Sequence, residues 1–311
     1  MKKNKGTSHK NRNLIVAAFE RAAKFLIFRL LLFFRYIRFA IMRLKAKDNL
    51  LLVNVQGSKM RLDLSDIGIS IDLAVDKIRE PQSTETIKKI IKKGDVIVDI
   101  GANIGYYALM ESRLTGSRGF VYAIEPVPEN FKNLEYNIRL NHFKNIECHM
   151  IGIGDKNGTA KIYLSPNSNL NSLVMQKGKL TTGSIKIKLK TLGRFIRGKK
   201  FPNFIRMDVE GYEYEIIKGM KNILNSKKPL TIFIEIHPHI MKREQTIFVL
   251  KTLKRCGFEA TRISRSFTTT EMAVKSKNEI DYSGRSISSL INDELIISGG
   301  KGAFEIFFEK K

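Results

Sequence analysis

The sequence predicts an α/β protein with a doubly wound, mostly parallel sheet and helices on both faces. From residue 84 onward, short apolar segments typical of buried strands alternate with longer segments of helical spacing. Most of the apolar segments end on an acidic residue or a glycine turn, and doubly wound sheets bind ligands at these carboxyl ends. With 311 residues, 43% of them hydrophobic, the chain is long enough to bury a large core.

The N-terminal part of the chain differs in composition from the rest. Residues 1–47 hold thirteen Lys or Arg and one acid, Glu20, and so carry nearly half of the net charge of +25. Residues 1–13 are polar and basic, and we expect a disordered tail there. The two cysteines, Cys148 and Cys256, lie far apart and form no metal-type spacing, which indicates free thiols in a reducing compartment.

Residues 14–47 combine Leu, Ile and Phe with regularly placed basic residues, which is typical of an amphipathic helix in a membrane interface. A helix that packs on its own domain or on a partner explains the pattern equally well. Four arginines between residues 25 and 44 disfavour a membrane-spanning helix. We therefore expect a cytoplasmic protein with peripheral contact to the anionic inner face of a membrane. The basic residues that share one helical face are Arg21, Lys24, Arg29, Arg35, Arg38, Arg43 and Lys45.

The remaining elements follow as one domain over residues 48–311. Alternation around Gly57 predicts a β-hairpin over residues 48–66, and residues 161–164 and 184–192 predict a second, inserted hairpin. The predicted strands are residues 96–101, 120–126, 146–155, 203–211, 230–238, 259–264 and 303–311. The predicted helices are residues 84–95, 103–114, 128–141, 212–224 and 246–257.

The turn after the first of these strands points to a particular cofactor. Gly101 and Gly105 have GxxxG spacing rather than the GxGxxG of dinucleotide sites, and Asp99 would repel a phosphate. S-adenosylmethionine (SAM) has no phosphate and carries a sulfonium and an ammonium group. Asp99 is placed to balance the ammonium directly or through water, and Glu125 is placed to accept both ribose hydroxyls. Asp155 follows the third strand, where it either approaches the adenine amino group or forms a turn.

Five segments in this order resemble the FkbM-type SAM-dependent methyltransferases: DIGANIGYYAL, AIEPVPENFKNLEYN, GIGDKNGTAKIYL, KTLGRFI and FIRMDVEGYEYEIIKGM. The likeness covers about residues 50–240, with its core motifs within residues 84–240. It implies a class I methyltransferase fold with a seven-stranded sheet, and O-methylation of a sugar, glycolipid or secondary metabolite. It also implies that the cofactor site is formed by Asp99, Gly101, Asn103, Gly105 and Glu125.

The chain departs from the family pattern at two places. Gly193 stands where members usually have an acid, and Arg206 and Met207 stand where many have a lysine before the acid of the fourth strand. Because the second departure lies beside a strand end, it leaves the substrate contacts there open.

Methyl transfer to a hydroxyl needs a group that removes the hydroxyl proton near the transferred methyl. Asp208, Glu210 and His237, at the ends of the fourth and fifth strands, are the candidates, and a histidine ordinarily titrates near neutrality. A purely structural histidine beside Pro238 is the alternative. The same three side chains are suitable for a divalent metal ion that would acidify the hydroxyl, but the spacing does not require one, so no metal is predicted.

Other functional classes fit the sequence less well. A nicotinamide dehydrogenase would need the missing GxGxxG. A nucleic-acid methyltransferase agrees with the basic charge, but the basic arm lacks interleaved aromatic residues for base stacking. A non-enzymatic membrane or partner-binding protein with a degenerate cofactor fold is disfavoured by the intact glycine turn and acids. We expect a small-molecule, glycan or lipid-linked acceptor, with a pocket shaped by residues 165–184 and 266–302.

Overall fold

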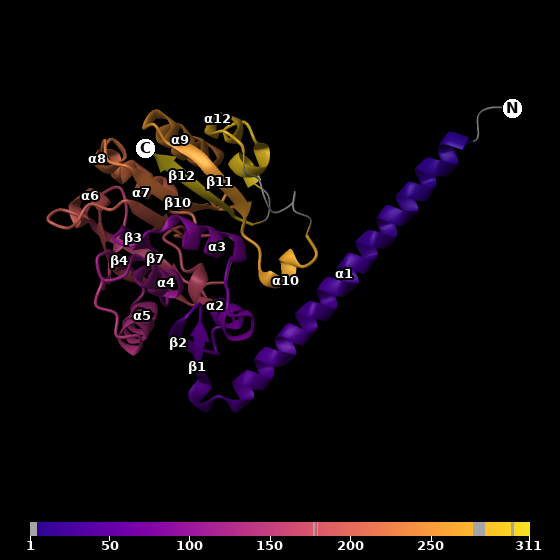
Figure 1. Ribbon diagram of the computed structural model, residues 1–311, viewed down its shortest axis with the longest axis horizontal. Helices are drawn as coiled ribbons and strands as arrows, with labels where there is room; N and C mark the ends of the chain where they lie inside the picture. Colours follow the sequence, from indigo (N-terminus) through magenta and orange to yellow (C-terminus); the bar gives the residue numbers. More distant parts are fainter. Residues whose placement is uncertain (1–4, 177, 179, 276–283, 300–301) are drawn as a thin grey trace.

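The computed structural model describes residues 5–176, 178, 180–275, 284–299 and 302–311, which form one domain and a long N-terminal helix, α1 (Figure 1). The domain is built on a seven-stranded sheet in the order β11-β12-β10-β9-β3-β4-β5. Among the described strands of this sheet, the antiparallel pairs are those that β12 forms with β10 and β11, and the other four pairs are parallel. The doubly wound, mostly parallel sheet is thus confirmed. Its strands are β3 (Val96–Ile100), β4 (Phe120–Ile124), β5 (Ile146–His149), β9 (Phe204–Met207), β10 (Leu230–Ile236), β11 (Glu259–Arg265) and β12 (Phe304–Lys310).

Helices cover both faces of this sheet (Figure 1). Alternate strand residues point to opposite faces, so Val98 and Ile100 enter one core cluster and Ile97 enters the other. The Ile97 face is covered by α3 (Pro81–Ile90), α4 (Tyr106–Thr115) and α5 (Pro128–Leu140). The opposite face is covered by α7 (Glu213–Gly219), α8 (Lys221–Leu224) and α9 (Arg243–Arg255).

The strand order reverses between β3 and β9. The chain runs from β3 outward through β4 to β5, and it later resumes on the other side of β3 with β9 and β10. Doubly wound sheets bind ligands outside the carboxyl ends of the strands at such a reversal. We therefore expect a ligand site among the segments that follow β3, β4, β9 and β10.

Two smaller sheets lie beside the main one. β1 (Leu50–Val55) and β2 (Ser58–Asp63) form an antiparallel hairpin, and β7 (Gly158–Leu164) pairs antiparallel with β8 (Gly183–Lys190). The predicted single strand over residues 146–155 is wrong. The chain leaves the main sheet after His149, because the N–H of Ile151 turns back to the His149 carbonyl, and β6 (Gly152–Ile153) then pairs with β8.

Short helical segments complete the domain. They are η1 (Lys47–Asn49), α2 (Ile69–Ile71), η2 (Asp72–Asp76), η3 (Ser168–Leu170), α6 (Leu192–Phe195), α10 (Thr269–Met272), α12 (Ile287–Leu290) and η4 (Leu295–Gly299).

Helix α1 (Lys5–Lys45) begins nine residues earlier than expected, so residues 5–13 are helical rather than disordered, while residues 1–4 lie outside the described residues. Lys, Arg and Asn, which are common in this stretch, are compatible with a helix. The last part of α1 packs on the domain and the rest projects away from it (Figure 1). In the described part of the chain, no helix has both the length and the apolar character needed to cross a membrane.

A buried ion pair fixes α1 to the domain. Arg35 is 8% exposed and contacts Asp72 and Asp76 of η2, and its Nε lies 2.9 Å from the Asp76 carboxylate. Phe39 is buried one turn further on, and Arg38 donates to the Val75 carbonyl. Arg35 and Arg38 therefore face the domain, which differs from the basic outer face expected for them.

Candidate cofactor and acceptor site

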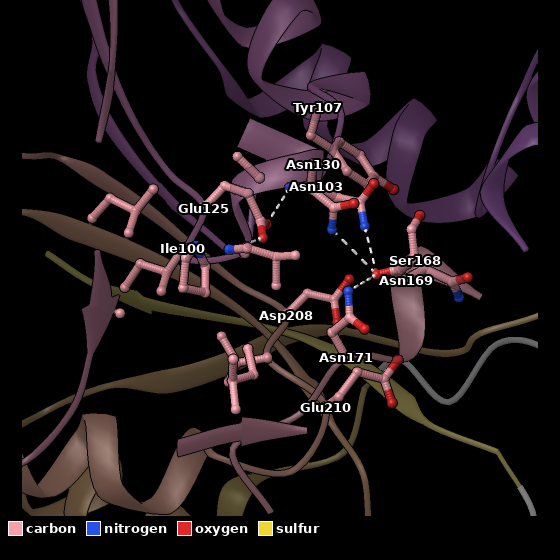
Figure 2. A pocket seen from close by; sticks show the side chains of 18 of the residues that line it. Ile100, Asn103, Tyr107, Glu125, Asn130, Ser168, Asn169, Asn171, Asp208 and Glu210 are labelled. Carbon is pink, nitrogen blue, oxygen red and sulfur yellow. Dashed lines mark hydrogen bonds between the residues drawn. The ribbon is translucent and has the colours of Figure 1, made fainter. Parts of the chain in front are cut away.

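A pocket opens at the carboxyl ends of β3, β4 and β9, at the reversal of strand order (Figure 2). It holds about 810 Å³ of space, including the part open to solvent, which is the size range of small-molecule sites. Apolar side chains form much of its wall, and a few polar groups converge on it. The polar residues labelled in Figure 2 are Asn103, Glu125, Asn130, Ser168, Asn169, Asn171, Asp208 and Glu210.

The glycine turn after β3 allows the backbone segments in this part of the pocket wall to approach each other closely. Gly101 has a φ of 87°, and a Cβ built on it would lie 1.9 Å from the carbonyl oxygen of Asp208. Glycine is therefore required for the close approach of the β3 and β9 ends. Gly105 has a φ of 98° and precedes α4, where a Cβ would meet Leu134 at 2.8 Å. Gly101 lines the pocket, whereas Gly105 supports the turn from behind.

Glu125 follows β4 and presents its carboxylate to the pocket (Figure 2). Its Oε2 accepts the N–H of Asn103 and its Oε1 accepts the N–H of Val127, both at 2.9 Å. Glu125 is only 4% exposed to solvent. Burial raises the pKa of Glu125 to about 7, although the backbone hydrogen bonds act in the opposite direction.

Three asparagines donate to one carbonyl in a loop at the pocket, two of them from outside the loop and Asn171 from within it (Figure 2). The side-chain amides of Asn103, Asn130 and Asn171 donate to the carbonyl of Ser168 at 3.2, 3.3 and 2.9 Å. The expected contribution of residues 165–184 is therefore present, whereas the described part of residues 266–302 does not line this pocket. Asn130 and Asn171 were not predicted. The polar run SPNSNLNSL, residues 165–173, was the only sequence signal for Asn171, because Asn side chains commonly bond backbone groups in loops, and Asn130 lies outside this run.

Asp99 is the last residue but one of β3 and does not line the pocket. It is fully buried, and its Oδ1 accepts a 3.1 Å hydrogen bond from Nη1 of Arg206, its register partner on β9. Burial raises the pKa of Asp99, and the Arg206 guanidinium opposes this shift. Asp99 was expected to balance the cofactor ammonium directly or through water, and in the structure its carboxylate is paired with Arg206 behind the pocket wall.

Asp155 also lies outside the pocket. Its Oδ2 is 3.2 Å from Nζ of Lys218 on α7, in a half-exposed ion pair. Because β6 pairs with β8 rather than with the main sheet, the chain carries Asp155 toward α7 and away from the strand ends.

The structure brings together the three proposed catalytic residues. Asp208 and Glu210 line the pocket, and one side-chain ligand atom each of Asp208, Glu210 and His237 lie within 4.8 Å of one another. A second group of the same kind consists of Glu80, Asp208 and Glu235. Carboxylates and an imidazole at such distances can accept a proton or hold a cation.

His237 is 3% exposed and surrounded by carboxylates. Its Nδ1 lies 2.9 Å from Glu213, and its Nε2 lies 3.7 Å from Glu210 and 3.9 Å from Glu235. Burial by itself lowers the pKa of His237, but Glu210 and Glu213 outweigh it, so this pKa lies well above its ordinary value. His237 itself does not line the pocket, so the catalytic role and the structural role both stay predictions.

Comparison with known proteins identifies the family of the chain. Residues 99–260, more than half of the chain, match the methyltransferase FkbM domain. The chain belongs to the FkbM methyltransferase family. The resemblance of the sequence motifs is thus confirmed, and this FkbM protein is a SAM-dependent methyltransferase.

Two named relatives show how far the similarity extends. This member of the FkbM family is 26% identical to hexuronic acid methyltransferase AglP of Haloferax volcanii over 195 residues, which cover 61% of this chain and 76% of AglP. It is 28% identical to methyltransferase sdnD of Sordaria araneosa over 155 residues, which cover 40% of this chain and 60% of sdnD.

Solved structures include that of M. jannaschii TYW2 in complex with AdoMet. It has 15% sequence identity and a TM-score of 0.46, and the alignment covers 85% of this chain and 86% of TYW2.

Proposed function

We propose that this FkbM-family methyltransferase transfers a methyl group from SAM to a hydroxyl oxygen of a sugar, a glycolipid or a secondary metabolite. One observation carries the proposal: a single pocket joins the glycine turn and Glu125 to the acidic residues Asp208 and Glu210. The glycine turn and Glu125 suit the nucleoside of SAM, whereas Asp208 and Glu210 suit an acceptor hydroxyl that must lose a proton. The printed name of AglP says that this relative acts on a hexuronic acid, which favours a sugar acceptor.

In this proposal the cofactor lies along the glycine turn. Glu125 accepts the ribose hydroxyls, because its carboxylate is buried at the end of β4 and faces the pocket. The missing Cβ of Gly101 lets the ends of β3 and β9 approach each other closely beside the methionyl part of the cofactor. Arg79 in the pocket wall is suited to the cofactor carboxylate. Asp99 acts as a positioning residue through Arg206.

The acceptor oxygen attacks the methyl carbon in line with the breaking carbon–sulfur bond. The electron pair of that bond remains on sulfur, so neutral S-adenosylhomocysteine is formed. The hydroxyl proton leaves to the group formed by Asp208, Glu210 and His237. Since SAM already activates the methyl carbon, the work of the protein is to align the acceptor and to assist loss of its proton.

We further propose that α1 holds the enzyme at an anionic membrane surface without crossing it. Two observations support this. Large apolar side chains of α1 stay exposed outside the domain contact, among them Phe19, Phe25 and Phe33 at 77%, 65% and 59%. Lys24 and Arg29 are exposed on the same projecting part. Apolar residues beside cations fit the boundary between headgroups and acyl chains. A lipid-linked acceptor would then meet the pocket near its own membrane.

The test of the proposed reaction uses methyl-labelled SAM. Purified full-length protein is incubated with glycan and lipid extracts from cells that lack it, and labelled products are separated and treated with mild alkali. The proposal predicts labelled, alkali-stable methyl ethers on an acceptor. Label that alkali releases as methanol would indicate carboxyl esters instead, and label confined to nucleic acid would contradict the acceptor class.

A further inference from the structure

We propose that Arg35 of α1 is a positioning residue for the cofactor and acts on the pocket through Asp72 and Arg79. These three side chains form a series of ion pairs that leads from the N-terminal helix to the pocket wall. Arg35 contacts the Asp72 carboxylate, and Oδ2 of Asp72 lies 3.5 Å from Nη1 of Arg79. Arg79 lines the pocket. This role of Arg35 rests on the proposed contact between Arg79 and the cofactor carboxylate.

Asp72 is shared between the two arginines. Its side chain is only 12% exposed, its Oδ1 contacts Arg35, and its Oδ2 faces Arg79. Because Arg35 holds one oxygen, the carboxylate presents the other to Arg79 in a fixed orientation. Without Arg35, Arg79 is the cation that remains in contact with Asp72, so both carboxylate oxygens would turn toward it. The guanidinium of Arg79 would then be drawn away from the pocket.

Other groups hold the rest of Arg79 in place. Its backbone N–H donates to the Tyr106 hydroxyl at 3.2 Å, and its carbonyl accepts the Thr84 hydroxyl at 2.7 Å. Its Nε lies 2.6 Å from the Glu80 carboxylate. Asp72 therefore sets the direction of the outer end of the guanidinium. Among the contacts of the described residues, none engages Nη2, so this nitrogen is the donor left for a cofactor carboxylate.

The backbone between Asp72 and Arg79 depends on support from its surroundings. The π-helical segment η2 is followed by Lys77 with a φ of 58° and by Glu80 with a φ of 45°. Side-chain-bearing residues keep this left-handed conformation only where the surrounding structure holds them in it. The end of α1 supplies part of this support, because Phe39 of α1 and Leu73 of η2 belong to the same buried core cluster.

The contacts of η2 predict a coupling between α1 and the cofactor. If docking of α1 places Arg79 for the cofactor, then bound cofactor must favour the docked position of α1 by the same factor. The helix that projects from the domain would thus affect the pocket through a few buried charges, without contact with the ligand.

Calorimetry with S-adenosylhomocysteine and methylthioadenosine tests this role. Both ligands are thioethers of adenosine, but only the first has an ammonium and a carboxylate. In full-length protein without lipid, Arg35→Met should weaken S-adenosylhomocysteine binding by about tenfold, the scale of one hydrogen bond to a charged group, and leave methylthioadenosine binding unchanged. Arg38→Met is the matched control. It removes a contact from α1 to the Val75 carbonyl but none with Asp72, so it should bind both ligands like wild type.

Two further variants test the path through Arg79. Arg79→Met should itself weaken S-adenosylhomocysteine binding, and adding Arg35→Met to it should cause no further loss, because Arg35 acts through Arg79. Arg35→Lys keeps the buried charge but lacks the fork that reaches both Asp72 and Asp76, so its affinity should lie between those of wild type and Arg35→Met. If circular dichroism shows that Arg35→Met does not fold, Arg35→Lys decides.

The possible failures are distinguishable. Wild-type affinity in the Arg35 variants, an equal loss for methylthioadenosine, or losses that add in the double variant would overturn the role of Arg35 while the proposed cofactor site stands. Wild-type affinity in Arg79→Met would overturn the Arg79 contact and the series of ion pairs with it. Absence of S-adenosylhomocysteine binding to wild type would contradict the proposed function itself, and the role of Arg35 with it.

Discussion

Nη1 of Arg206 lies 3.1 Å from Oδ1 of Asp99, so this acidic residue near the end of β3 faces the neighbouring strand β9. Arg206 also donates from Nη2 to Asp208 at 3.0 Å, and its guanidinium stands 4.1 Å from the centre of the Tyr107 ring. One buried cation thus holds two acidic strand ends together at the reversal of strand order. It fixes the positions of the glycine turn and of Asp208, which both line the pocket.

This relationship predicts a stability effect. Asp99→Ala should lower the free energy of unfolding by about 3 kcal/mol, because it removes one of the two carboxylates paired with the buried Arg206. Urea denaturation measures the loss. The double variant Asp99→Ala/Arg206→Met should recover part of it, since no buried cation is left underpaired. Losses that simply add in the double variant would show that the pair does not couple the strand ends.

Substitutions at Gly94 and Gly101 allow the cost of backbone strain to be measured separately from the cost of a steric clash. Gly94→Ala should cost about 1–2 kcal/mol of unfolding free energy, because its φ is 95° but a Cβ there meets nothing within 4 Å. Gly101→Ala should cost about 3 kcal/mol or more, because its Cβ would also collide with the Asp208 carbonyl. Equal costs in thermal or urea unfolding would mean that the β3 and β9 ends do not approach as described.

Much of the fold could be predicted from sequence because its signals are local. Alternating apolar strands and segments of helical spacing predict the parallel sheet. The one strand that was predicted wrongly covers residues 146–155, where the apolar residues from Ile146 to Ile153 were interpreted as a single strand. Nothing local in IECHMIGIGD marks the turn at His149, since the pairing of β6 with β8 is a contact between distant segments.

The candidate site was only partly predictable, for a related reason. Strand ends and glycine spacing locate Gly101, Asn103, Glu125 and Asp208, all of which line the pocket. The partner of Asp99 lies 107 positions away on β9 and appeared only as a departure from the family pattern at Arg206. Contacts between side chains that are distant in sequence produce no periodic pattern, so the sequence alone does not predict them.

The pKa of Glu125 predicts how SAM affinity changes with pH. With this pKa at about 7, the carboxylate is ionised above pH 7 and protonated below it. An ionised carboxylate accepts the ribose hydroxyls more strongly, so affinity should be highest above pH 8 and fall as the pH drops through 7, by at most about tenfold per unit. Calorimetry on wild type and Glu125→Gln measures this. The same slope in both proteins would remove Glu125 from the cofactor contact.

The projecting part of α1 predicts membrane binding. Full-length protein should float with vesicles rich in anionic lipid, and less so as salt rises, because each cation near the surface contributes about 1 kcal/mol that salt screens. Phe25→Ser/Phe33→Ser should release the protein, whereas Leu52→Ser, an apolar residue 62% exposed on β1, should not. Flotation that ignores lipid charge and both helix substitutions would favour a protein partner for α1.

Calorimetric titration of SAM into wild type and Glu125→Ala tests the central claim most directly, because the claim is that the pocket at the ends of β3, β4 and β9 binds this cofactor. One SAM per chain is expected for wild type. Glu125→Ala should lose about 1–3 kcal/mol of binding free energy, the scale of a charge-assisted hydrogen bond, while circular dichroism shows the fold unchanged. Absence of SAM binding to wild type, or equal affinity in Glu125→Ala, would contradict it.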